Sequence, residues 1–116
     1  MIRKLYPGGK RKAFNISYDD GVIQDIRFVQ LLNQYGLKGT FNLNYGLMRQ
    51  GFTWQHECGM SVRRLREEEI VPVYSGHEIA SHSYSHPYFD NMAEVDILKE
   101  LGADKFFLER LTATSD

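Results

Sequence analysis

Two histidines near the end of the chain have a spacing that suits metal binding. His82 and His86 are four positions apart, and Pro87 follows directly. One helical turn between them would bring their Cβ atoms to roughly 5–6 Å from each other. Both imidazoles could then bind the same ion. Since proline disfavours helical geometry in the residue before it, we expect the turn to end at His86. The alternative without function is a hydroxyl-rich loop that holds two histidines by coincidence. This stretch alone is compatible with a metal site and with such a loop.

Two consecutive carboxylates provide the second candidate group. Residues 13–18 alternate between apolar and polar side chains, which predicts a strand that ends at Asp19 and Asp20. Residues 76–81 predict a buried strand that ends just before His82. Ligands of parallel α/β folds collect at the C-terminal ends of the strands, so both groups should meet at one edge. Asp-Asp-Gly by itself also occurs in ordinary turns and helix caps.

The rest of the chain predicts the alternating strands and helices that would position these groups. We expect a helix at 23–35, a strand at 38–45, a long loop or short hairpin at 46–62, and helices at 66–74 and 92–111. Pro72 is tolerated only in the first turn of a helix, so the regular part of its helix should begin no earlier than about Glu68. Strand-helix-strand order is typical of a parallel sheet with right-handed crossovers, which is an α/β fold.

Length and composition limit the classes of function. A chain of 116 residues is expected to form one domain. The net charge of −1 gives no electrostatic argument for a nucleic-acid partner. Arg63, Arg64 and Arg66 precede three glutamates, a mixture that predicts solvated surface, with anion binding as the minority alternative. No apolar run is long enough for a secretory signal or a membrane span, so we expect a cytoplasmic protein with no membrane partner. Cys58 is alone, which excludes an intrachain disulfide.

The residue types favour a catalytic metal over a structural one. One carboxylate and two histidines form a set of three ligands that leaves coordination positions open. The second carboxylate is then free to act as a base. A non-haem iron(II) site also uses two histidines and one carboxylate, and it stays as an alternative.

The same motifs resemble a known family. Ser17-Tyr18-Asp19-Asp20-Gly21 and His82-Ser83-Tyr84-Ser85-His86 are similar to the first two motifs of the polysaccharide deacetylases that share the NodB homology domain (carbohydrate esterase family 4). Residues 36–41 and 76–82 resemble the second and third strands of that family, and the resemblance covers about 13–111.

The resemblance implies a distorted (β/α) barrel and a role for each candidate residue. Asp20, His82 and His86 would bind a divalent metal, with zinc expected and Co²⁺, Ni²⁺ or Fe²⁺ as alternatives. Asp19 would be the general base for the attacking water. The reaction implied is hydrolysis of N- or O-acetyl groups on a polysaccharide, so the expected partner is an acetylated carbohydrate.

The sequence departs from the family pattern after the third strand. The later motifs, which would supply an oxyanion donor, a residue that orients the base, and an acid, have no counterpart in 88–116. We therefore expect a single incomplete domain at 1–116, with about three parallel core strands and without the C-terminal half of the barrel. Activity would require that half, and a catalytically inactive metal- or sugar-binding fragment is the alternative. Exposed sheet edges would also favour a homo-oligomer.

Overall fold

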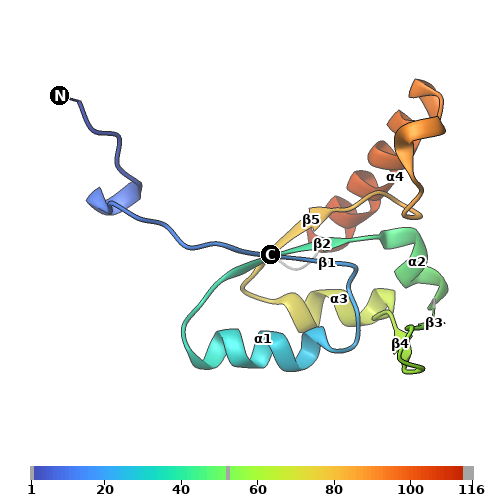
Figure 1. Cartoon of the computed structure of the whole chain (residues 1–116), viewed down its shortest axis with the longest axis horizontal. Coiled ribbons are helices and arrows are strands. Elements are labelled where there is room, and N and C mark those ends of the chain that lie inside the picture. Colours follow the sequence, from blue (N-terminus) through green and yellow to red (C-terminus); the bar gives the residue numbers. More distant parts are fainter. Residues whose placement is uncertain (1, 52, 114–116) are drawn as a thin grey trace.

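A computed structural model describes residues 2–51 and 53–113, and its centre is a three-stranded parallel sheet (Figure 1). The strands are β1 (Ile16–Asp19), β2 (Gly39–Leu43) and β5 (Glu78–Ser81), in the order β1-β2-β5. The other elements, in chain order, are the short 3-10 helix η1 (Pro7–Gly9), α1 (Asp25–Gln34), α2 (Tyr45–Gln50), β3 (Thr53–Gln55), β4 (Ser61–Arg63), α3 (Glu67–Tyr74), η2 (Phe89–Asn91) and α4 (Glu94–Ala113). The α/β architecture predicted from strand and helix order is confirmed.

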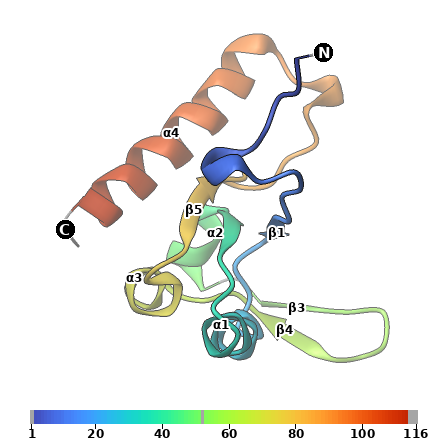
Figure 2. The ribbon, with the colours of Figure 1, turned by 90° about the vertical axis from the view of Figure 1, so that its left-hand side faces the viewer.

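The two faces of β2 differ in polarity. Phe41 and Leu43 are fully buried in one cluster with apolar side chains from α1, α3 and α4. Figure 2 shows these three helices beside the strands of the sheet. Thr40 and Asn42 point to the opposite face and bond side chains of the neighbouring strands β5 and β1. Alternation along the strand therefore gives one apolar face, on which the helices pack, and one polar face.

The segment predicted as a long loop or short hairpin has more structure than expected. It contains helix α2 and the antiparallel hairpin β3–β4, in which Trp54 pairs with Val62. α2 ends at Gly51, whose φ of 66° places it in the left-handed region typical of a helix stop. Six residues are too few for helical periodicity to stand out in a sequence, which explains why α2 was missed.

Other boundaries differ from the prediction by one to three residues, as at the starts of β5 (Glu78, predicted 76) and α4 (Glu94, predicted 92). β1 begins at Ile16 and not at residue 13. α3 begins at Glu67, inside the predicted range of 66–74 but one residue before the start predicted for its regular part. The expectation that Pro72 lies in the first turn is wrong, because the helix continues through it. Proline removes a single backbone donor, and a helix of eight residues stabilised by buried Ile70 and Tyr74 tolerates that loss.

Both outer strands of the parallel sheet have a partner on one side only within the described residues. α4 exposes an apolar stripe as well: Val95, Leu98 and Phe106 each expose more than half of their surface. No helix in the described part of the chain is long and apolar enough to cross a membrane.

Candidate metal site at the strand ends

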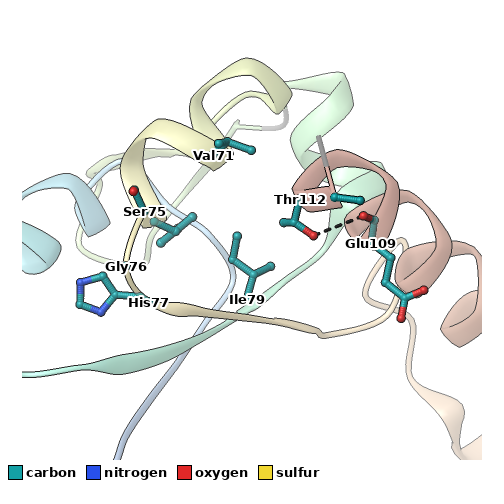
Figure 3. Close-up of a pocket in the computed structure, with 9 residues that line it drawn as sticks. Val71, Ser75, Gly76, His77, Ile79, Glu109 and Thr112 are labelled. Atoms are coloured by element: carbon teal, nitrogen blue, oxygen red, sulfur yellow. Dashed lines mark hydrogen bonds between the residues drawn. The ribbon is translucent and has the colours of Figure 1, made fainter. Parts of the chain in front are cut away.

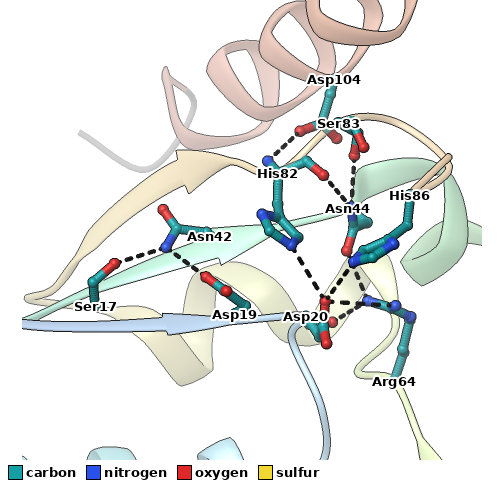
Figure 4. A network of polar contacts seen from close by, with 10 residues as sticks. All are labelled: Ser17, Asp19, Asp20, Asn42, Asn44, Arg64, His82, Ser83, His86 and Asp104. Atoms are coloured by element: carbon teal, nitrogen blue, oxygen red, sulfur yellow. Dashed lines mark hydrogen bonds and ion pairs between the residues drawn. The ribbon is translucent and has the colours of Figure 1, made fainter. Parts of the chain in front are cut away.

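Asp20, His82 and His86 come together at the C-terminal edge of the sheet (Figure 4). The Oδ1 atom of Asp20 lies 3.6 Å from Nε2 of His82 and 3.5 Å from Nε2 of His86. The three potential ligand atoms all lie within 4.8 Å of one another, and no other such group occurs among the described residues. The predicted meeting of the two motifs at one sheet edge is therefore what the structure shows.

These distances fit a divalent metal ion. Tetrahedral zinc with ligand bonds of about 2.0–2.1 Å separates neighbouring ligand atoms by about 3.3 Å, close to the two separations at Asp20. The Oδ1 atom of Asp20 is also buried and has no hydrogen-bond partner in the described part of the chain. A buried carboxylate oxygen without a donor is costly unless a cation compensates it. The guanidinium of Arg64 compensates it only in part, because its Nη2 lies 3.8 Å away and forms no hydrogen bond to this oxygen. The donor set thus suits a cation better than it suits a loop with two unrelated histidines.

Backbone conformation directs Asp20 into the site. β1 ends at Asp19, and the chain then turns through two left-handed residues, Asp20 with φ 83° and Gly21 with φ 63°. The amide of Asp20 still donates to the carbonyl of Asn42 at 3.0 Å, which fixes the turn to β2. The positive φ of Gly21 favours glycine, and a Cβ atom there would also displace the end of the Met48 side chain, 2.8 Å away.

The histidine loop has a different conformation from the one predicted. The expected helical turn between His82 and His86 is not formed, because Ser83 (φ 69°) and His86 (φ 58°) both adopt left-handed geometry. The two imidazole rings nevertheless lie 5.0 Å apart, centre to centre. The loop replaces helical bonds with contacts to the segment after β2, such as the 3.0 Å bond from the amide of Gly46 to the carbonyl of Tyr84.

Asp19 lies next to this group but in a separate set of contacts. Its Oδ1 accepts a hydrogen bond of 2.8 Å from the side-chain amide of Asn42, which also donates to Ser17 at 2.8 Å. Asp19 is exposed and is not part of the three-atom cluster. Its accessible carboxylate is free to accept a proton, which is compatible with the predicted role of a base.

The interpretation of the arginine cluster as solvated surface is wrong for Arg64. Its side chain is buried, and it donates hydrogen bonds to the backbone carbonyl of Asp20 and to Oδ1 of Asn44. Trp54 covers the guanidinium, with 5.2 Å between Cζ and the ring centre. Burial lowers the pKa of Arg64, and the neighbouring Asp20 carboxylate opposes that shift. The other two arginines agree with the prediction: Arg66 is exposed, and Arg63 forms an ion pair of 3.0 Å with Glu69.

The sequence-based prediction also missed Asp104, a buried carboxylate on α4 that holds the backbone near His82. Asp104 accepts bonds from the amide of Tyr45 at 2.6 Å, the amide of His82 at 3.1 Å and the hydroxyl of Ser81. Burial raises its pKa, while these three donors act in the opposite direction. The sequence did contain a signal for its burial: Asp104 stands four positions before Leu108, and therefore on the same face of the helix as this apolar residue.

A separate hollow lies at the other end of β5, between α3 and the last turns of α4 (Figure 3). His77 lines it, but both ring nitrogens are engaged: Nδ1 accepts from the amide of Gly39 at 3.1 Å and Nε2 lies 2.8 Å from Oδ1 of Asn33. The structural role predicted for His77 agrees with these contacts, and no described residue that lines the hollow belongs to a group of three possible metal ligands.

Comparisons with known proteins agree with the motifs. A family model described as polysaccharide deacetylase matches residues 7–115. Among solved structures, the chain is similar to the Streptococcus pyogenes deacetylase PplD in complex with acetate, with 19% identity and a TM-score of 0.72. The match covers 87% of this chain and 42% of that chain, so the 116 residues span less than half of the length of the solved deacetylase. No curated protein matched the sequence.

Proposed function

The chain belongs to the polysaccharide deacetylase family, and we propose that its site serves metal-dependent removal of acetyl groups from a carbohydrate. The observation that carries the proposal is the buried Asp20 oxygen with two imidazole nitrogens 3.5 and 3.6 Å away. We propose Asp20, His82 and His86 as the ligands of a divalent ion, with zinc as the expected metal. When bound, such an ion lowers the pKa of a water molecule and polarises an acetyl carbonyl.

Asp19 is proposed as the general base. Its carboxylate is exposed beside the ligand cluster, and Asn42 holds one of its oxygens, which leaves the other able to accept a proton. As a water oxygen attacks the acetyl carbon, Asp19 takes the proton, the bond from that carbon to nitrogen or oxygen breaks, and acetate leaves. The remaining sugar amine or hydroxyl takes up the proton.

A second candidate is a metal- or sugar-binding unit without turnover of its own. It is favoured by the coverage of the comparison, because the chain corresponds to 42% of the solved deacetylase. We propose that turnover needs the remainder of the barrel, which would close the exposed polar face of the sheet around the substrate.

Zinc titration and acetate release separate the two candidates. We expect the metal-free full chain to bind one equivalent of Zn²⁺, measured by competition with a chromophoric chelator, and His82→Ala to abolish this binding. Acetate release from an acetylated chito-oligosaccharide that is abolished by Asp19→Asn would support the enzyme. Zinc binding without acetate release would support the binding unit, and stoichiometric zinc binding by His82→Ala would exclude the proposed ligand set.

A further inference from the structure

We infer that Arg64 and Asn44 are positioning residues of the metal site, forming a brace that fixes the Asp20 turn relative to the histidine loop before any metal binds. The brace is defined as the connected hydrogen bonds from the carbonyl of Asp20, through the Arg64 and Asn44 side chains, to the carbonyls of His82 and Ser83. This inference rests on the proposed function, because it concerns the geometry of the same site.

The first half of the brace connects Arg64 to the carboxylate-bearing turn. Its Nη1 donates to the backbone carbonyl of Asp20, and its Nη2 lies 3.8 Å from Oδ1 of the same residue. The backbone around Arg64 is tied to the turn as well, since the amide of Leu65 donates to the carbonyl of Gly21 at 2.8 Å. An exposed arginine could not hold this geometry, but the Arg64 side chain is only 6% exposed and Trp54 covers it.

The second half connects Asn44 to the histidine loop. Asn44 is completely buried at the end of β2. Its Nδ2 donates to the carbonyl of His82 and, at 2.9 Å, to the carbonyl of Ser83, while its Oδ1 accepts from Arg64 at 2.9 Å. All of the amide's hydrogen-bonding atoms are therefore used to join the two halves.

The brace offers a physical reason for the unusual conformation of the histidine loop. Ser83 and His86 both have positive φ, which is unfavourable for residues with a side chain. The two bonds from Asn44 hold the backbone on either side of the first strained residue. Partners that orient metal ligands typically change metal affinity or activity by about 10- to 100-fold when they are removed.

The test compares Asn44→Leu with wild type in two measurements. Hydrogen exchange of the metal-free full chain should show faster exchange of amides 82–86 in the variant. The dissociation constant for Zn²⁺ should rise by about 10- to 100-fold. Asn44→Asp keeps the side-chain shape and adds negative charge: a purely electrostatic role of Asn44 predicts tighter zinc binding in this variant, whereas loss of the brace predicts weaker binding.

A core variant distinguishes positioning from general destabilisation. Ile70 is completely buried in the apolar cluster and belongs neither to the three possible ligands nor to the brace, so Ile70→Val should lower the melting temperature without changing zinc affinity. Unchanged exchange of the loop in a folded Asn44→Leu protein, or equal loss of affinity in Ile70→Val, would overturn the brace. If wild type fails to bind zinc while loop exchange still responds to Asn44, the proposed function fails and the brace remains as a device of the fold.

Discussion

Asp19 and Asp20 are consecutive carboxylates in very different surroundings. Asp19 belongs to a group of exposed polar side chains on the sheet, here called the Asp19 side, in which the amide of Asn42 donates to both Ser17 and Asp19. The Asp20 side is built on the brace of Arg64 and Asn44, both of which are buried. A turn into left-handed geometry at Asp20 separates the two environments within one peptide unit.

These two environments would let a single strand end supply two chemical roles. A metal ligand must be held at a fixed distance from other ligands, which burial and several hydrogen bonds achieve. A general base must stay accessible to water and substrate, which an exposed carboxylate with one holding amide allows. We expect substitutions on the Asp20 side to change metal affinity, and substitutions on the Asp19 side to change turnover alone.

The largest effect is expected from removing a ligand. His82→Ala should abolish stoichiometric zinc binding, because one carboxylate and one imidazole remain of the three ligand atoms. Chelator competition measures the loss. His56→Ala is the matched control, since His56 lies in the exposed hairpin loop away from the cluster, and it should bind zinc like wild type.

The next effect concerns the other carboxylate. In a preparation that releases acetate, Asp19→Asn should lower kcat by about 100- to 10,000-fold, because the amide cannot accept the proton of the attacking water. The zinc dissociation constant should stay within a few-fold of wild type. A large loss of zinc affinity in this variant would mean that Asp19 and Asp20 are not functionally separate.

A smaller effect is expected from the amide that holds Asp19. Asn42→Ala removes the 2.8 Å bond to Asp19 and should reduce kcat by about 10-fold with unchanged zinc affinity. Comparison with Asn44→Leu tests whether the Asn42 amide affects only the base, Asp19, while the Asn44 amide affects only the metal site. Similar losses of zinc affinity in Asn42→Ala and Asn44→Leu would show that the surroundings of Asp19 and Asp20 do not act separately.

A third carboxylate, Asp25, is buried, and its Oδ1 has no hydrogen-bond partner among the described residues. Burial raises its pKa to about 6, with a smaller contribution from Asp20, while the bond from the Tyr74 hydroxyl acts against the shift. Because the pKa of the folded state exceeds the unfolded value of 3.8, the protonated form favours folding, and this stability is lost as pH rises from about 4 through 6.

Asp25→Asn should remove that pH dependence. A shift of about two pKa units corresponds to about 3 kcal/mol at most, so the wild type should lose up to about that much unfolding free energy between pH 4 and pH 7 relative to the variant. Denaturant unfolding in the presence of a metal chelator measures the difference. Parallel pH profiles for the two proteins would show that Asp25 does not titrate in this range.

The sequence was sufficient to place Asp20, His82 and His86 at one edge of a parallel sheet, because strand alternation marks where each strand ends. Their role as metal ligands stays a prediction. The sequence was insufficient for Arg64, whose neighbours Arg63 and Arg66 and the following glutamates have the composition of a surface. Arg64 is covered by Trp54 of the β3–β4 hairpin and bonded to Asn44, which is 20 positions away in the sequence. The strands of this hairpin are too short to be recognised by periodicity. The conformation of the histidine loop was mispredicted for a related reason: Asn44, distant in sequence, holds its carbonyls in place of helical bonds.

The most direct test of the two-carboxylate account is an anomalous difference map of the zinc-loaded chain, recorded at the zinc absorption edge. We expect one peak within about 2.0–2.2 Å of Oδ1 of Asp20 and of Nε2 of His82 and His86, with Asp19 outside the coordination sphere. A peak coordinated by Asp19 in place of Asp20, or located away from both histidines, would contradict it.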